Sequence, residues 1–505
     1  MGKFRVAAVF SDNMVLQREK NIKIFGWGTD GEKVTVRLKE KTVETTVHNG
    51  KWMTEFPPME AGTGYTMELI CGTDTVRFQN IAIGEVWLAG GQSNMEFELR
   101  NCIGGKEILE QEPDPNIRFY YTPKNAYKDE KFYQDEEASH WEEFGQEGTK
   151  YWSAVGYFFA RKVAQEMKVP VGIIGCNWGG TSASVWMTRE SLSEDKDTSE
   201  ILKAYDMGIA GKSVEEQKKE FKDYMDYYTV WSEKCGKMYE ENPDTEWDDV
   251  IRICGENRYP GPMNCFNQIR PCGLHECMLE RVMPYSLRGF IYYQGEDDET
   301  HPKIYYKLLT RLIRQWREEW EDLSLPFLIV QLPMFTYKDT KDTKSWCYLR
   351  EAQMKTYQTI KNTGIAVILD CGQFHEIHPK NKQPVGERLA LQALYQVYHK
   401  VDKKEAFGPI FAYCEYEKNG LRICLNHAED GLLVKGELCG FEIAGADKTY
   451  VTAEARIEGN TIYLTADSVL EPKYARYCWT NFGPVSVFGT NGLPLAPFRT
   501  SEQDD

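Results

Sequence analysis

Three short polar segments of this chain contain residues that could do chemistry. The first is GQSNM (91–95), which directly follows the apolar run 86–89 and offers the hydroxyl of Ser93. A buried strand that ends in glycines presents such a hydroxyl at the carboxyl end of a parallel sheet, where α/β enzymes place their reacting groups. Ser93 is therefore a candidate nucleophile, and the alternative is a serine that only caps a helix.

The other two segments offer partners for that serine. They are YYQGE (292–296) and HEIHPKNK (375–382), and each stands at the end of an apolar run, 289–293 or 365–370. A serine hydroxyl is a weak nucleophile until a base takes its proton and hydrogen-bond donors receive the developing negative charge. Three polar clusters at three strand ends predict one site.

The spacing of the HEIH run disfavours a metal. His375 and His378 are three residues apart, one short of the HExxH pattern that marks zinc hydrolases together with a further ligand. The sequence also has no glycine-rich phosphate loop and no dinucleotide-binding fingerprint. We therefore expect neither a metal nor a cofactor.

The composition indicates a globular protein whose partner is a small molecule. The 505 residues carry a net charge of −17 and no segment is strongly basic, which disfavours nucleic acid as a partner. The 29 Tyr, 23 Phe and 13 Trp supply material for cores and for aromatic surfaces that stack on sugars. Because no run of about 18 apolar residues exists, we expect no membrane span.

Cysteine usage favours a reducing compartment. The 14 cysteines include no CxxC pair, and the apolar run near the start is only five residues long, shorter than a secretory signal needs. Both features predict a cytoplasmic location. The sequence does not predict an oligomeric state.

The pattern of apolar and polar segments along the chain predicts three domains. Residues 1–80 alternate in short segments broken by turns, such as HNG (48–50), and predict an N-terminal β domain. Residues 81–400 alternate strands with helices and predict an α/β domain with a mainly parallel sheet covered on both faces. Residues 405–505 return to short strands and predict a C-terminal β domain, for which packing against the first is one arrangement. The expected strands of the α/β domain are 85–89, 171–176, 289–293, 327–332 and 365–370, with an amphipathic helix at 303–320.

Residues 188–262 form a polar, charge-rich segment with helical periodicity inside the α/β domain. A core element would not carry so many charges, so we interpret this segment as an insertion. The sequence leaves three roles open: a lid or wall over the site, an interaction surface, and a solvated helical excursion.

Longer segments around these motifs add a resemblance to a known family. They include VFSDNMVLQREKNIKIFGWG, EVWLAGGQSNMEFEL, VPVGIIGCNWGGTSASVW, RGFIYYQGEDD and HPKNKQPVGERLALQAL. In order and spacing, and over nearly the whole chain, they resemble bacterial sialate O-acetylesterases, which are SGNH-type serine esterases and, more broadly, carbohydrate acetylesterases. The resemblance implies an SGNH-hydrolase-like (flavodoxin-like) parallel sheet flanked by helices.

The resemblance also implies roles for single residues. Ser93 matches the nucleophile, and its own backbone N–H is one donor to the tetrahedral oxyanion. Gly179 matches the second donor, with Gly180 as the alternative. The side chain of Gln294 matches the third donor, and its alternative role is that of a polar residue satisfied at a strand end. His378 matches the general base, which takes the proton of Ser93 and returns it to the leaving sugar oxygen.

The acid that orients His378 is where this chain departs from the pattern. Many SGNH enzymes carry DxxH, but the residue three positions before His378 is His375, which cannot serve as a carboxylate. We assign the role to Glu376, two positions before the histidine, where the family often has an aspartate. Asp370 is the competitor, and a backbone carbonyl could hold the ring without any acid.

The expected reaction is removal of an acetyl group from a sugar through an acetyl-Ser93 intermediate. We expect 9-O-acetylated sialic acid as the substrate, and an arginine such as Arg350 or Arg270 would bind its carboxylate. Acetylated oligosaccharides from xylan or mannan are the alternative substrates. The alternative of another class is a non-catalytic carbohydrate-binding protein.

Overall fold

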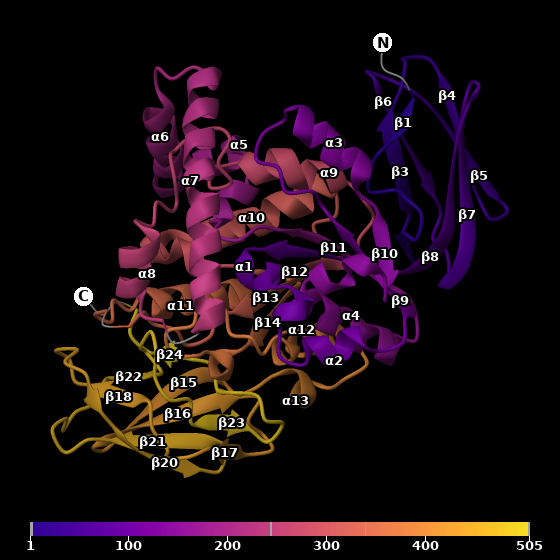
Figure 1. Ribbon diagram of the computed structural model, residues 1–505. Helices are drawn as coiled ribbons and strands as arrows, with labels where there is room; N and C mark the ends of the chain where they lie inside the picture. The colour runs from indigo at the N-terminus through magenta and orange to yellow at the C-terminus, as the bar shows by residue number, and fades with distance from the viewer. Residues whose placement is uncertain (1–3, 243–244, 339, 503–505) are drawn as a thin grey trace.

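Parallel strands form the centre of the molecule. The structure, a computed structural model, describes residues 4–242, 245–338 and 340–502, with a mixed α/β region between two groups of β strands (Figure 1). The five predicted strands of the central sheet are present, the last beginning at Thr363 rather than at Ile365, and β9 is a further strand that the sequence analysis missed. The strand order is β9 (Asp114–Tyr121), β11 (Val171–Asn177), β8 (Asp74–Gly91), β12 (Gly289–Tyr293), β13 (Phe327–Gln331) and β14 (Thr363–Val367), with β10 (Trp141–Phe144) antiparallel at the β9 edge.

Helices cover both faces of this sheet. One face carries α4 (Ala154–Met167) and α12 (Gln383–Gln396), and the other carries α10 (Tyr305–Glu319) and α11 (Ser345–Thr359). Trp87 of β8 contacts Phe159 of α4 with ring centroids 5.2 Å apart, whereas Phe290 of β12 contacts Trp316 of α10 at 5.4 Å. The amphipathic helix predicted at 303–320 is thus confirmed, as α10 preceded by the 3₁₀ turn η6 (Pro302–Ile304).

The N-terminal strands form two sheets, and one of them is continuous with the central sheet. β1 (Arg5–Val6), β3 (Ile22–Trp27) and β6 (Lys51–Phe56) make the separate sheet. The first half of β8 pairs with β7 (Gly62–Cys71), which pairs in turn with β4 (Lys33–Leu38), and β4 pairs with β5 (Lys41–Thr46). The short strand β2 (Val15–Gln17) runs parallel to the middle of β8. Because β8 is 18 residues long, it crosses the boundary predicted near residue 80.

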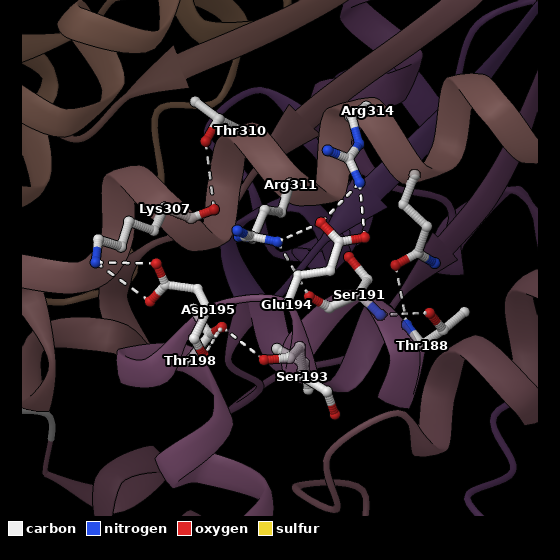
Figure 2. Close-up of polar contacts among 12 residues, drawn as sticks. Thr188, Ser191, Ser193, Glu194, Asp195, Thr198, Lys307, Thr310, Arg311 and Arg314 are labelled. Atoms are coloured by element: carbon white, nitrogen blue, oxygen red, sulfur yellow. Dashed lines mark hydrogen bonds and ion pairs between the residues drawn. The ribbon is translucent and has the colours of Figure 1, made fainter.

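The segment predicted as an insertion is helical, and ion pairs attach its start to α10. It contains α5 (Arg189–Ser193), α6 (Lys196–Ile209), α7 (Val214–Glu241) and α8 (Trp247–Cys254). Figure 2 shows Glu194 beside Arg311 and Arg314, and Asp195 beside Lys307. A groove of about 470 Å³ runs along these residues, and its cations are already engaged by acidic side chains or backbone carbonyls. We interpret this region as an attachment rather than a binding site.

The C-terminal strands pack against the central domain and not against the N-terminal strands (Figure 1). Their apolar core includes Met334, Ile365 and Val367 of the central domain, and Arg499 forms an ion pair with Glu351 of α11 at 2.7 Å. The strands are β15 (Ile410–Glu417), β16 (Gly420–Asn426), β21 (Thr461–Thr465) and β20 (Glu454–Glu458) in one sheet, β17 (Leu432–Val434) and β23 (Val487–Gly489) in a second, and β19 (Val451–Thr452), β18 (Phe441–Ala444), β22 (Tyr474–Tyr477) and β24 (Phe498–Arg499) in a third.

Short elements connect the larger ones. The short helices are α1 (Ser93–Glu96), α2 (Gly105–Leu109), α3 (Glu130–Ala138), α9 (Glu280–Val282) and α13 (Lys403–Ala406), and the tighter or wider turns are η1 (Leu99–Asn101), η2 (Glu147–Tyr151), η3 (Ala183–Trp186), η4 (His275–Leu279), η5 (Glu296–Thr300) and η7 (Leu369–Cys371).

Among the described residues, no helix combines the length and apolar character needed to cross a membrane.

A buried carboxylate joins the N-terminal strands to the central sheet. Glu85 of β8 is fully buried, and its oxygens lie 2.5 Å from Nε of Arg18 and 2.6 Å from Nε of Arg288. Gln17 Nε2 also donates to this carboxylate, at 3.2 Å. Burial alone would raise the pKa of Glu85, but the hydrogen bonds and charges of Arg288 and Arg18 outweigh burial and hold the pKa below its ordinary value.

Removing the charge of Glu85 should destabilise the fold in a pH-dependent way. We expect Glu85→Gln to lower the free energy of unfolding by about 2 to 4 kcal/mol at pH 7, because two largely buried arginines lose their buried carboxylate and keep only the half-exposed Glu19. Since the pKa of Glu85 is lower in the folded than in the unfolded state, its contribution is present above about pH 4 and is lost as the pH falls through the folded pKa.

Urea unfolding of both proteins at pH 7 and at successively lower pH measures this contribution. The exposed Glu40→Gln variant is the control and should match the parent protein throughout. A difference between Glu85→Gln and the parent that stays constant into the acid range would contradict the assignment.

Candidate active site

Ser93 lies at the carboxyl end of β8, between the two strands that flank it. Gly91, the last residue of β8, pairs with Asn177 of β11 and with Tyr293 of β12. Its φ is +134°, and a Cβ at this position would lie 2.1 Å from the carbonyl oxygen of Tyr293. Only glycine fits this approach. The chain then turns, and Ser93 begins the short helix α1.

His378 reaches Ser93 from a loop 285 residues later in the chain, and its Nε2 lies 2.8 Å from Ser93 Oγ. Burial and, next, the charge of Lys382 lower the pKa of His378 from its ordinary value, while Glu376 and Glu96 act in the opposite direction. His378 is therefore neutral at neutral pH, and its Nε2 can accept the proton of the serine hydroxyl.

The structure does not place a carboxylate on the ring of His378. Glu376 Oε1 instead accepts a hydrogen bond from the backbone N–H of His378 at 2.8 Å, because a side chain two residues earlier is well placed to bond that group. Asp370 is engaged by Arg388, at 2.5 and 2.9 Å. Within the described residues, no carboxylate forms a hydrogen bond or ion pair with this imidazole. Glu376 thus holds the main chain of the loop, which corrects its predicted role of orienting the ring.

The glycine loop that follows β11 packs directly on Ser93. A Cβ added to Gly179 would lie 3.1 Å from Ser93 Cβ, and Gly180 follows with a φ of +64°. The N–H of Gly179 donates to Glu96 Oε2 at 2.6 Å, and Glu96 in turn forms an ion pair with Lys124. The N–H of Gly179 is thus engaged by Glu96 in this structure.

Gln294 does not offer a free amide to Ser93. Its side chain is buried, and its Nε2 donates to Asp298 Oδ2 at 2.6 Å, to Gln92 Oε1 at 3.2 Å and to a backbone carbonyl. Its Oε1 accepts from the hydroxyl of Tyr305 at 2.9 Å. A primary amide has two donor hydrogens, and these acceptors occupy both. The predicted oxyanion role of Gln294 is therefore corrected to that of a satisfied residue at the end of β12.

Three buried polar residues beside Ser93 and His378 were not assigned by the sequence analysis. They are Asn94, Glu296 and Lys382, one from each of the three motifs. Asn94 Nδ2 donates to Glu296 Oε1 at 2.6 Å, and Lys382 Nζ donates to Asn94 Oδ1. The signal was present, since each stands within four residues of a residue that was assigned, but sequence alone does not show that the three meet.

The insertion also reaches this region. Tyr259, which lies at its end, donates its hydroxyl to the carbonyl of Gly180 at 3.2 Å and lies 3.4 Å from Asp297 Oδ1. Tyr259 as a whole residue remains 39% exposed. A side chain from the insertion therefore borders the loop that carries Gly179, and the charge-rich composition of the segment gave no indication of this contact.

No metal site is evident in the part of the chain that the structure describes, where no three His, Cys, Asp or Glu side chains are grouped to hold an ion. The HEIH run lies in a turn rather than on a helix, and His375 has a φ of +62°. His375 Nδ1 accepts the backbone N–H of Lys338 at 2.9 Å, so the two histidines serve different contacts.

Neither arginine considered as a partner for a substrate carboxylate is free. Arg350 is fully buried and donates to the carbonyls of Pro333 and Thr480. Arg270 forms an ion pair with Glu276 at 2.8 Å. Both residues therefore stabilise the fold.

Comparisons with known proteins point to one class of enzyme. Residues 273–395 match a family model described as carbohydrate esterase, sialic acid-specific acetylesterase. The sialate O-acetylesterase of Mus musculus is 25% identical over 98% of this chain and 94% of its own, and that of Homo sapiens is 26% identical over 78% and 71%. The crystal structure of a carbohydrate acetylesterase from Xanthomonas citri matches with a TM-score of 0.78 and 26% identity, covering 99% of this chain and 100% of that one.

The charge of Glu96 should be measurable at His378. We expect Glu96→Gln to lower the pKa of His378, because the substitution removes a negative charge that favours the imidazolium form. The chain has eight histidines, so their imidazole resonances can be followed by NMR in a pH titration, with His378→Asn assigning the signal.

Glu98→Gln is the matched control for this titration. Glu98 is two residues from Glu96 but is paired with Arg100 at 2.7 Å, and its substitution should leave the pKa of His378 in place. A pKa that rises in Glu96→Gln, or that shifts equally in both variants, would show that Glu96 does not act on the imidazole.

Proposed function

We propose that this chain, a carboxylic ester hydrolase that resembles the sialate O-acetylesterases, is a serine esterase that removes O-acetyl groups from sugars. The observation that carries the proposal is the distance of 2.8 Å between Ser93 Oγ and His378 Nε2. A neutral imidazole in this position activates a hydroxyl as a nucleophile. The order β11-β8-β12-β13-β14 corresponds to the doubly wound order 2-1-3-4-5 and supports an SGNH-type arrangement, with β9 as an addition.

The proposed reaction has two halves. Ser93 Oγ attacks the acetyl carbonyl carbon while His378 Nε2 takes its proton, and collapse of the tetrahedral intermediate breaks the bond to the sugar oxygen, which receives that proton from His378. Water then loses a proton to His378 and attacks the acetyl-Ser93 ester. The second tetrahedral intermediate then collapses: Ser93 Oγ leaves and recovers its proton from His378, and the acetic acid that forms ionises to acetate in the solvent.

The oxyanion of each intermediate needs donors at the place where charge develops. The backbone N–H of Ser93 lies at the start of α1, and the N–H of Gly179 lies beside it on the glycine loop. The carboxylate of Glu96 accepts the N–H of Gly179 in this structure, so an acetyl oxygen must displace that carboxylate to receive the hydrogen bond. With Gln294 engaged elsewhere, we propose these two backbone groups as the oxyanion donors.

We propose that His378 acts as the general base without a carboxylate on its ring. Glu376 fixes the backbone N–H of His378, and this contact supports the loop from which the ring projects. A Ser-His pair of this kind keeps the proton transfers described above, since the imidazole is the only group that moves protons in them.

Two substrate classes follow from different observations. The names of the relatives support an O-acetylated sialic acid, of which we propose the 9-O-acetylated form. The lack of a free arginine among the site residues described above favours neutral acetylated sugars, such as xylan- or mannan-derived oligosaccharides, because Arg350 and Arg270 are engaged. All 14 cysteines are free thiols, which supports a cytoplasmic location and a small imported sugar as the substrate.

Substitution of the serine should abolish activity. We expect Ser93→Ala to lower kcat for acetate release from an acetylated sugar by about 10⁴-fold or more, because no other group forms the acetyl ester. Ser193→Ala, on the exposed side of α5, is the control and should retain full activity. A fluorophosphonate should label the parent protein and Ser193→Ala, and labelling of Ser93→Ala at the same rate would refute the assignment of the nucleophile.

A direct comparison of substrates should separate the two classes. We expect kcat/KM for acetylated xylo-oligosaccharide to exceed that for 9-O-acetylated sialic acid, because no free arginine among the site residues described above meets the carboxylate of sialic acid. The methyl ester of 9-O-acetylated sialic acid, which lacks the charge, should be hydrolysed faster than the free acid. A preference for the free acid over its methyl ester would instead support a sialate esterase.

A further inference from the structure

We propose that Lys382 is a positioning residue that holds His378 against Ser93 through the side chain of Asn94. The inference rests on the proposed serine esterase reaction, and it assigns a role to three motif residues that the reaction itself does not use. These are Asn94 of GQSNM, Glu296 of YYQGE and Lys382 of HEIHPKNK.

Asn94 is the centre of the contacts. It is fully buried, and its Nδ2 donates to Glu296 Oε1 at 2.6 Å and to the carbonyl oxygen of Ile377 at 2.9 Å. Asn94 directly follows Ser93, and Ile377 directly precedes His378. One side-chain amide therefore joins the backbone of the nucleophile to the backbone of the base.

Lys382 determines which way this amide points. An ammonium group only donates hydrogen bonds, so Asn94 Oδ1 must face Lys382 Nζ, and both Nδ2 hydrogens must then face Glu296 and Ile377. A rotated amide would place its oxygen against two acceptors. The cation thus selects the one orientation that binds the His378 loop.

The ammonium itself is held in place. Lys382 is 1% exposed, directly precedes α12, and lies 4.8 Å from the ring centroid of Phe97 and 5.6 Å from that of Tyr293. Burial lowers its pKa to about 8, opposed by the nearby Glu296, Cys371, Glu376 and Cys102. Lys382 is therefore largely protonated at neutral pH, when it both donates to Asn94 and acts on His378.

The charge of Lys382 has a second effect on the base. It favours the neutral imidazole of His378, in the same direction as burial and against Glu376 and Glu96. A cation that only supported the fold would not be expected to move the pH at which His378 becomes active. The pH profile therefore distinguishes positioning of the base from general stabilisation.

The test compares Lys382→Met with Lys380→Met, using 4-nitrophenyl acetate and active sites counted by fluorophosphonate titration. Methionine keeps much of the apolar stem and removes the charge, whereas Lys380 is exposed in the same loop. We expect Lys382→Met to lower kcat about 10²-fold, as misplacement of a reacting group by about 1 Å does, with KM little changed. The acid limb of kcat/KM should move to higher pH, because His378 then binds a proton more readily. Lys380→Met should match the parent protein in both.

Two results would overturn the inference while leaving the serine esterase intact. One is a Lys382→Met enzyme with the kcat and acid limb of the parent, and the other is a fall in kcat with the acid limb unmoved. If the parent protein neither hydrolyses acetyl esters nor is labelled at Ser93, the proposed function fails and this inference fails with it.

A measurement on the unsubstituted protein covers the case in which Lys382→Met does not fold. In protein labelled with ¹³C at the lysine Cε atoms, one lysine should titrate near pH 8, whereas exposed lysines titrate near about 10.4. The imidazole resonance of His378 should shift in the same step. Absence of such a lysine, or a His378 signal that ignores it, would also overturn the inference.

Discussion

The hydrogen bond between Ser93 Oγ and His378 Nε2 depends on two segments, distant in sequence, that meet at one edge of a parallel sheet. Neither residue lies in a long helix or within a strand, so neither is positioned by secondary structure alone. The parallel arrangement of β8, β11 and β12 brings their carboxyl ends together. Gly91 then allows β8 to approach Tyr293 more closely than any side chain would permit. Sheet register thus supplies the approximate placement, and the contacts behind the loops supply the rest.

Those contacts are buried and polar, and this has consequences for what the motifs do. A buried polar group costs free energy unless it is hydrogen-bonded, and most buried groups near Ser93 are paired, Oε2 of Glu296 being an exception. Gln294 is tied to Asp298 and Gln92, and Asn94 is tied to Glu296. Burial raises the pKa of Glu296 to about 7, so this carboxyl gains a proton readily as the pH falls. Most of the polar residues in the three motifs therefore support Ser93 and His378 rather than contact a substrate.

The sequence predicted the parts of this arrangement that depend on local pattern. The apolar runs singled out Ser93 and the segment 375–382, the family resemblance indicated His378 within that segment, and the structure brings Ser93 and His378 together. The five predicted strands and the helix at 303–320 followed from runs and periods of apolar residues. β9 was missed because its segment, DPNIRFYY, opens on a polar stretch with a proline and does not form a continuous apolar run. β8 was divided because its first half is polar and its second half apolar, although the backbone is one strand.

The parts that the sequence could not predict depend on contacts between distant side chains. Gln294 was expected to face the oxyanion, but Asp298 and Tyr305 engage its amide from the next turn and from α10. Glu376 was expected to face the imidazole, but it binds a backbone N–H. Both residues lie at the predicted site, and only the direction of each side chain differs from the prediction. Residue type and spacing predict which side chains lie near the site, whereas the hydrogen-bond partners of each side chain determine its role there.

The insertion likewise combines packing within its own helices with contacts to distant loops. Its helices α7 and α8 enclose a small apolar cluster of their own, formed by Trp231, Cys235, Val250 and Cys254. The end of the insertion nevertheless meets the glycine loop through Tyr259, and α8 is preceded by Glu246, which pairs with Lys338 at 2.7 Å. Lys338 in turn donates its backbone N–H to His375, three residues before His378.

The insertion contacts the glycine loop beside Ser93 and, through Lys338, the loop that carries His378. It is therefore placed to form a wall of the site. In the proposed reaction the acetyl group lies against the glycine loop, which puts Tyr259 and the carboxyl of Asp297 on the side of the sugar. The matched family segment, residues 273–395, contains His378 and Lys382 but not the insertion. The contacts proposed to hold His378 against Ser93 come from Asn94, Glu296 and Lys382, all outside the insertion, which instead borders the glycine loop through Tyr259.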